Sequence, residues 1–175
     1  MIQDNPVGVR TAQQSEVDHL ARIWFDGWQD AHADILPAEL RRLRTLESFQ
    51  DRLRAALPNV RVVGRPGSPA GFCIVKDNEL DQLYVSAEAR GFGVAAMLMK
   101  DAEARFAANG IELAWLACAI GNERAARFYE KCGWRRVGVM MHYPETPEGK
   151  FPLQVWRYEK ALGRDGCRIS GYPTT

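Results

Sequence analysis

The clearest chemical signal in the sequence is a pair of glycines, Gly91 and Gly93, directly after Arg90. An apolar run ends just before them at Val85, and helical periodicity begins just after them. The first amides of a helix have no acceptor inside the helix and carry the positive end of its dipole. Glycines add no side chain that would hold an anion away from these amides. The pattern therefore predicts a binding site for a phosphate-bearing ligand at the start of a helix.

Two other interpretations of the same glycines compete with this one. Residues 91–96 fit the dinucleotide fingerprint G-x-G-x-x-A, but residues 86–90 separate them from the strand, and the next strand, near 113–119, has no acidic residue for a ribose. The antiparallel strands expected upstream also disfavour a doubly wound nucleotide fold. In the other interpretation, the glycines only turn the chain.

The periodicity of the apolar residues predicts the elements that position this turn. We expect strands at 7–11, 60–63, 71–76, 80–85, 111–119, 134–141 and 153–160, and helices at 14–28, 37–57, 94–106 and 122–132. Mixed charge at helical spacing in 37–57 indicates a solvated face. The helix around Leu98 is a long crossover, so its flanking strands should be parallel. The order predicts an α/β fold, a mixed sheet of about seven strands with helices on both faces.

Length and composition limit the class of protein. The 175 residues fit one domain, which we assign to 1–163, and the glycine-rich stretch 164–175 is expected to be a tail. The net charge of +1 gives no reason to expect a nucleic acid as partner. No apolar run approaches the length of a membrane span, and residues 1–10 lack the apolar core of a signal peptide, so no membrane partner is expected.

Cysteines and histidines add little chemistry. None of the four cysteines forms a Cys-x-x-Cys pair, which favours free thiols in a reducing cytoplasm. The three histidines have no ligand spacing with each other or with cysteine, so no metal site is expected. The oligomeric state stays open, with a homodimer as one option.

Two blocks of the sequence resemble the conserved motifs of the GNAT superfamily of acyl-CoA-dependent N-acetyltransferases. Arg90-Gly91-Phe92-Gly93-Val94-Ala95 is similar to the family's pyrophosphate loop, Arg/Gln-x-x-Gly-x-Gly/Ala, and residues 80–85 are similar to its fourth strand. Residues 122–134 are similar to the later block Asn-x-x-Ala-x-x-x-Tyr-x-x-x-Gly-Phe. The resemblance covers about residues 7–162. Phe92 stands where many members have a basic residue, so Arg90 is the only cation of the loop. Ala87 stands where a proline is usual.

The resemblance implies the GNAT fold and acetyl-CoA as the cofactor. The diphosphate of coenzyme A would lie on the amides of residues 90–95, and Asn122 would contact the cofactor or only cap its own helix. The pantetheine arm would pair with Leu83, Tyr84 and Val85, in a gap between this strand and the next one. The Val85 amide would then donate a hydrogen bond to the thioester carbonyl.

The resemblance also implies that Tyr129 is the general acid toward the departing thiolate, with a merely structural tyrosine of the helix interior as the alternative. A tyrosine has a pKa of about 10 and a thiol about 8.5, which favours a hydrogen bond over full proton transfer. A base must accept the proton of the amine. The candidates are Asp26, His32, Glu79 and Asp81, and spacing does not decide between them. Asp81 joins Tyr129 and Val85 in the predicted catalytic set.

The acceptor site is expected between the opening helices, with Trp28 and His32, and the loop 142–152, with His142. Core packing is expected for at least one of Trp24 and Trp28. The predicted activity is transfer of an acetyl group from acetyl-CoA to a primary amine of a small molecule or peptide, by direct attack in a ternary complex. The alternative is a GNAT-like domain that binds an acyl-CoA as a sensor or partner module with little catalysis.

Overall fold

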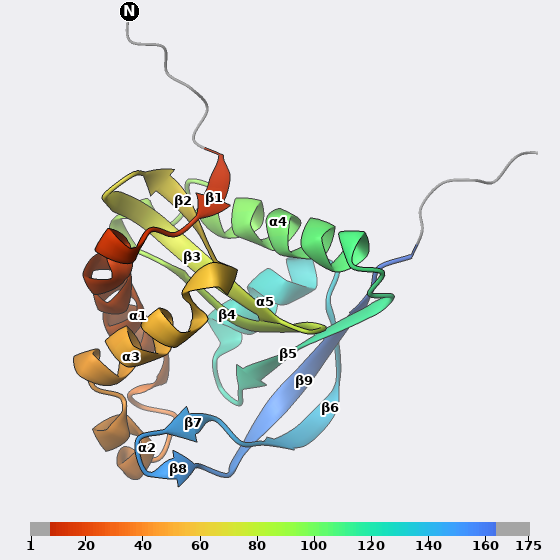
Figure 1. Ribbon diagram of the computed structural model, residues 1–175. Helices are drawn as coiled ribbons and strands as arrows, with labels where there is room; N and C mark the ends of the chain where they lie inside the picture. Colours follow the sequence, from red (N-terminus) through yellow and green to blue (C-terminus); the bar gives the residue numbers. More distant parts are fainter. Residues whose placement is uncertain (1–7, 164–175) are drawn as a thin grey trace, which may run out of the picture.

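A mixed sheet of seven strands forms the centre of the protein (Figure 1). The computed structural model describes residues 8–163, so Val7 of the expected first strand and the expected tail 164–175 lie outside the described residues. The strand order is β1-β2-β3-β4-β5-β9-β6. The strands are β1 (Val9–Thr11), β2 (Val60–Arg65), β3 (Ser68–Lys76), β4 (Glu79–Val85), β5 (Leu113–Ala119), β6 (Arg135–His142) and β9 (Leu153–Ala161).

Helices cover both faces of this sheet, which confirms the predicted α/β class. The helices are α1 (Val17–His32), α2 (Ala38–Leu43), α3 (Leu46–Ala56), α4 (Val94–Ala108) and α5 (Glu123–Lys131). Side chains of β2 and β3 alternate between two cores: Val62 and Phe72 pack with α1 and α3, whereas Cys73 packs with α4. No helix within residues 8–163 is long and apolar enough to cross a membrane.

The predicted single helical stretch 37–57 is wrong, because it divides at Arg44. This residue has φ −90° and ψ 67°, outside the helical region, and it ends α2. Thr45 then begins α3 as an N-cap, with its side-chain oxygen accepting a hydrogen bond from the amide of Ser48 at 3.1 Å. A short hairpin of β7 (Glu145–Thr146) and β8 (Gly149–Lys150) was not predicted, since two-residue strands have no periodicity to detect.

The neighbouring strands β4 and β5 are parallel, as predicted, but they separate almost at once. Glu79 of β4 pairs with Trp115 of β5, and that is the single register pair between the two strands. Beyond it, β4 continues to pair with β3 as far as Val85, and β5 continues to pair with β9 as far as Ala119. The carboxyl ends of β4 and β5 therefore face each other across a gap in the sheet.

A β-bulge in β4 determines which side chains face the site. Ile74 of β3 pairs with Gln82, but Val75 pairs with Leu80, so Asp81 is one extra residue on β4. Side chains alternate along a regular strand, and residues three apart would point to opposite faces. Because Asp81 is an extra residue, Leu80 and Leu83 point to the same face of the sheet, and both pack in the α4 core. Tyr84 points to the opposite face and packs in the α1 core.

Candidate active site

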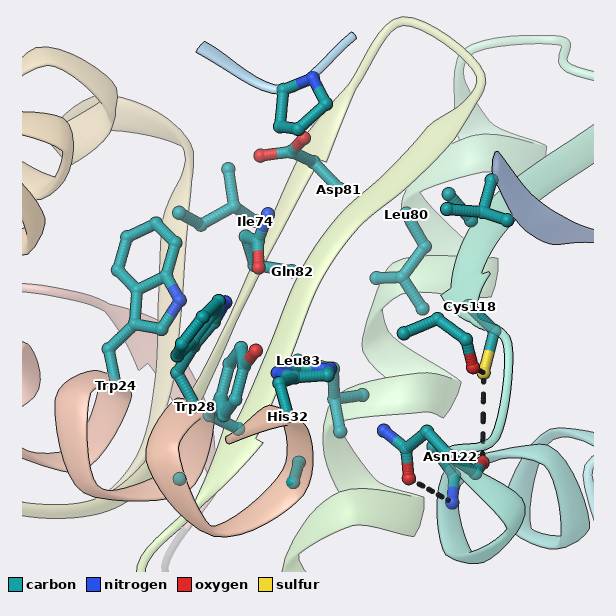
Figure 2. Close-up of a pocket in the computed structure, with 18 of the residues that line it drawn as sticks. Trp24, Trp28, His32, Ile74, Leu80, Asp81, Gln82, Leu83, Cys118 and Asn122 are labelled. Carbon is teal, nitrogen blue, oxygen red and sulfur yellow. Dashed lines mark hydrogen bonds between the residues drawn. The ribbon is translucent and has the colours of Figure 1, made fainter. Parts of the chain in front are cut away.

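One pocket of about 820 Å³ joins the two ends of the predicted site. It extends from the end of β4 and the start of α5 to the inner side of α1, α2 and α3 (Figure 2). Figure 2 shows Trp24, Trp28 and His32 on one side of β4, and Cys118 and Asn122 on its other side. The predicted residues that line it are Trp28, His32, Asp81, Leu83, Tyr84, Val85, Arg90, Ala95, Asn122, Tyr129 and His142.

The predicted residues Gly91, Phe92, Gly93 and Val94 do not line the pocket, but they form the turn that begins α4 beside it. The two glycines have φ of +85° and +81°, and a Cβ at either position would meet no atom within 4 Å. Phe92 is exposed, and the Val94 side chain is buried in the core. Backbone conformation requires these glycines, and the space in front of them is open to a ligand.

The amides of this turn are free to bind an anion. Within residues 8–163, no acceptor is assigned to the amides of residues 91–96, and the first bonded amide is that of Met97, which donates to the carbonyl of Gly93 at 3.0 Å. Gly93 is the N-cap of α4, and no side chain accepts a hydrogen bond there from the first amides of the helix. Free amides at a helix N-terminus fit the diphosphate of coenzyme A.

Arg90, predicted as the only cation of the loop, is already paired. Its guanidinium lies 3.0 Å from the carboxylate of Asp30 on α1, and Arg124 of α5 lies 3.2 Å from the same carboxylate. The hydrogen bonds from Arg124 and Arg90 lower the pKa of Asp30. This cluster connects α1, the glycine turn and α5 at the pocket, and no sequence pattern predicts it because Asp30, Arg90 and Arg124 are far apart in the chain.

The main chain of β4 offers donors to the gap between β4 and β5. The amide of Ser86 donates to the carbonyl of Ala70 at 2.8 Å, and Val85 pairs with Gly71. Hydrogen-bonded and non-hydrogen-bonded pairs alternate in an antiparallel ladder. The amides of Val85 and Leu83 therefore point away from β3 and toward the gap, where an extended ligand chain would find them.

Tyr129 and Asn122 lie on α5 beside this gap. Asn122 caps α5, since its side-chain oxygen accepts from the amide of Ala125 at 3.2 Å, and it also lines the pocket. The Tyr129 ring packs 5.8 Å from that of Tyr158. Burial raises the pKa of the Tyr129 hydroxyl, so this group is neutral and carries a proton to donate at physiological pH.

Two carboxylates of β4 line the other half of the pocket. Asp81 forms an ion pair with Lys76 at 3.4 Å. Burial, followed by the charge of Asp81, raises the pKa of Glu79 to about 7. A general base works best with a pKa near the operating pH, which favours Glu79 over Asp81. Glu79 and Asp81 were both predicted as candidate bases, but no sequence pattern indicates the bulge at Asp81 or the burial of Glu79 that distinguishes the two.

The remaining base candidates are less suitable. Burial lowers the pKa of His32 to about 4, and its Nδ1 atom is buried without a hydrogen-bond partner. Burial also lowers the pKa of His142. Asp26 is exposed on α1 and does not line the pocket. His32 and His142 are therefore neutral near pH 7 and contribute shape and hydrogen bonding at the pocket wall.

The prediction of a solvated face for residues 37–57 is wrong at two positions, Arg44 and Arg52. Arg44 is only 3% exposed, and Arg52 lies with its guanidinium 4.4 Å above the ring of Trp24. Both line the pocket. Arg52 stands beside Phe49 and Leu53, which are both buried, so its place within an apolar stripe was the signal in the sequence.

Comparisons with known proteins agree with this geometry. Residues 17–134 match the model of the acetyltransferase (GNAT) family. The chain is 28% identical over 138 residues to the peptidyl-lysine N-acetyltransferase YjaB of Escherichia coli, and the match covers 75% of this chain and 84% of YjaB. The fold of this chain is similar to the crystal structure of a GCN5-related N-acetyltransferase from Rhodopseudomonas palustris, with a TM-score of 0.68 and 20% identity. The match covers 88% of this chain and 94% of that one.

A second solved structure has a similar fold. The crystal structure of the PaiA N-acetyltransferase from Thermoplasma acidophilum in complex with coenzyme A has a TM-score of 0.59 and 19% identity, and the match covers 87% of this chain and 97% of that one. The mixed sheet with its gap and its free helix amides is the fold of an acetyl-CoA-dependent N-acetyltransferase. This chain belongs to the GNAT family of acetyltransferases, and its cofactor is acetyl-CoA.

Proposed function

We propose that the chain transfers an acetyl group from acetyl-CoA directly to a primary amine of a small molecule or peptide, with both substrates bound together. The observation that carries this proposal is the single pocket, which reaches from Val85 and Tyr129 to Glu79 and Asp81. A donor for developing negative charge, a proton donor and a base thus share one cavity. The name of YjaB makes a lysine side chain of a peptide one of the acceptors to test.

The cofactor is held mainly by main-chain groups. The amides of residues 91–96 bind the diphosphate, and the Leu83 and Val85 amides pair with the pantetheine arm in the gap between β4 and β5. Acetyl-CoA supplies an activated acetyl thioester. The Val85 amide donates to the thioester carbonyl oxygen, and a fixed donor at this position contributes about 3 kcal/mol to the lowering of the barrier.

Protons move at two residues of the chain. Glu79 accepts, through a water, the proton that the amine nitrogen loses as it bonds to the acetyl carbon. Tyr129 donates a hydrogen bond to sulfur as the bond between sulfur and that carbon breaks. Its raised pKa means that Tyr129 stabilises the thiolate as a donor and does not become a free phenolate.

Direct transfer is favoured over an acetyl-enzyme because the cysteine of the pocket is not activated. Cys118 lines the pocket, but burial raises the pKa of its thiol to about 12, and its Sγ donates to the carbonyl of Asn122 at 3.9 Å. The thiolate is the nucleophilic form of cysteine. At neutral pH Cys118 is a protonated thiol, and the amine itself is the attacking group.

Thiol release from acetyl-CoA in the presence of a panel of primary amines tests the activity. Free amino acids, polyamines and lysine-containing peptides form the panel, with mass spectrometry of the acetylated product. We expect amine-dependent release with both substrates required before any product appears. Binding of acetyl-CoA without amine-dependent release from any of them would favour the sensor alternative. We also propose a cytoplasmic location, from the free cysteines 73, 118 and 132.

A further inference from the structure

Two cations of the pocket, the buried Arg44 and the half-buried Arg52, have no ion-pair partner among residues 8–163. Arg44 donates from Nη1 to the carbonyl of Glu145 at 2.7 Å, and its Nε is buried without a partner. No described residue accepts a hydrogen bond from Arg52, whose guanidinium lies on the face of Trp24. Neither arginine takes part in an ion pair within residues 8–163.

The nearby acids form no ion pair with these arginines, although the charge of Asp81 acts on both and that of Glu145 acts on Arg52. Asp81 is paired with Lys76 at 3.4 Å, and Glu79 stands at the β4–β5 junction, opposite Trp115. Burial lowers the pKa of Arg44 to about 10, and the charge of Arg52 adds to this effect, so both groups remain cationic at neutral pH. Buried charges in proteins are normally paired, because an isolated one loses its hydration without compensation.

A structural role explains only part of this arrangement. The face of Trp24 attracts Arg52, and the Glu145 carbonyl holds the hairpin of β7 and β8 to Arg44. Neither contact supplies negative charge, and the N–H groups of Arg52 as well as the Nε of Arg44 still lack acceptors in the part of the chain that the structure describes. The planar guanidinium fork matches a carboxylate or a phosphate, with two parallel hydrogen bonds.

We propose that Arg44 and Arg52 bind a compact anionic group of the acceptor, so that the acceptor is a small primary amine that also carries a carboxylate or phosphate. This inference rests on the proposed function, since it places the amine of the same molecule at Glu79 and Asp81. One pocket holds both sets of groups. The wall behind the arginines is closed by Trp24 and Leu40, 1% and 2% exposed, which suits a small molecule better than a protein surface.

Binding to the CoA-saturated protein tests the inference without requiring turnover. Amino acids from glycine to 6-aminohexanoate are each compared with their carboxamides, and phosphoethanolamine with ethanolamine, by the shift in melting temperature. The first set reports a carboxylate and the second a phosphate. We expect at least one anionic amine to stabilise the protein clearly more than its neutral analogue. Equal shifts for every pair would overturn the inference.

Substitution of Arg52 assigns the effect to this site. Arg52→Met keeps an unbranched apolar stem and removes the guanidinium, and it should abolish the preference for the anionic amine. Arg54→Met on the same helix is the matched control, because Arg54 is exposed and pairs with Asp51 and Asp18. A preference that survives Arg52→Met would contradict the inference. Should that variant not fold, Arg52→Lys keeps the charge but loses the fork, and an unchanged preference there would contradict it equally.

Turnover separates this inference from the proposed function. For an anionic amine that is acetylated, Arg52→Met should raise KM at least tenfold and change kcat little, whereas KM for the neutral analogue should stay the same. Equal changes in KM for both amines would indicate a structural role. Failure of the proposed function is recognised differently, as absence of thiol release with every amine, whatever the binding preference.

Discussion

The two ends of the pocket are built in different ways. At the proposed cofactor end, which comprises β4 residues 83–85, the turn 90–95 and the start of α5, most of the groups that could bind a ligand are main-chain amides. At the proposed acceptor end, which comprises α1 to α3, Glu79, Asp81 and residues 142–150, these groups are charged side chains from distant segments that line the pocket. Main-chain groups depend on a short motif with glycines at fixed places, whereas side-chain charges depend on which segments the fold brings together. We therefore expect the cofactor end to tolerate few backbone changes and the acceptor end to determine specificity.

The largest effect should come from Gly93→Glu, which places a negative side chain where the diphosphate binds. Positive φ also strains the backbone, by about 1 kcal/mol for a residue other than glycine. Gly110→Glu is the matched control, because Gly110 has φ +73° and open space as well, but lies at the far end of α4. Both variants should lose similar stability, and only Gly93→Glu should lose thermal stabilisation by acetyl-CoA. Retained stabilisation in Gly93→Glu would place the ligand elsewhere.

Tyr129→Phe should lower kcat by about 10²-fold or more, since the departing sulfur loses its donor. The KM for acetyl-CoA should change little, because main-chain groups hold the cofactor. Tyr158→Phe is the control: its hydroxyl donates to Glu130 at 3.1 Å and it does not line the pocket. Steady-state kinetics of thiol release give the answer. Equal kcat for Tyr129→Phe and the wild type would remove Tyr129 from the mechanism.

Glu79→Gln should lower kcat/KM by about 10²-fold and change its pH dependence. Only ionised Glu79 accepts a proton, and its pKa is raised to about 7, so wild-type kcat/KM should fall as the pH drops below about 7. An acceptor amine with a pKa well below 6 keeps its own titration out of the profile.

A second variant tests the cause of this shift. The charge of Asp81 helps to raise the pKa of Glu79, so Asp81→Asn should move the acidic limb to lower pH. A limb that persists unchanged in Glu79→Gln would assign the base to another residue.

The smallest effect is expected where the two ends meet, at the Asp30 cluster. Asp30→Asn frees Arg90 and Arg124 and removes a negative charge beside the glycine turn. Acetyl-CoA should bind a few-fold more tightly at low salt, and the difference should shrink as salt rises. Asp26→Asn, an exposed change on the same helix, should leave the dissociation constant unchanged in calorimetry. Weaker binding by Asp30→Asn would mean that Asp30 mainly positions the arginines.

The short motifs of the sequence were sufficient to predict the elements of the proposed cofactor end because the hydrogen bonding there is local. The glycines at 91 and 93, the strand before them and the Asn122 cap are neighbours in the chain, and the structure shows the elements at the expected places. The break at Arg44 was not predicted because the charged residues keep helical spacing across it. Thr45 can act as an N-cap only where the chain leaves the helix just before it, and the spacing does not indicate that.

The sequence by itself determined the mixed sheet, the parallel pair β4 and β5, and the place of the glycine turn that begins α4, where we propose the anion site. Local hydrogen bonding and periodicity fix these features within a few residues of chain. Tertiary structure alone decided that Arg44 is buried and Arg52 half-buried beside it, that Arg90 pairs with Asp30, and that Glu79 has a pKa near neutrality. Each of these depends on burial and on charges brought together from segments far apart in the sequence, and no local pattern encodes that proximity.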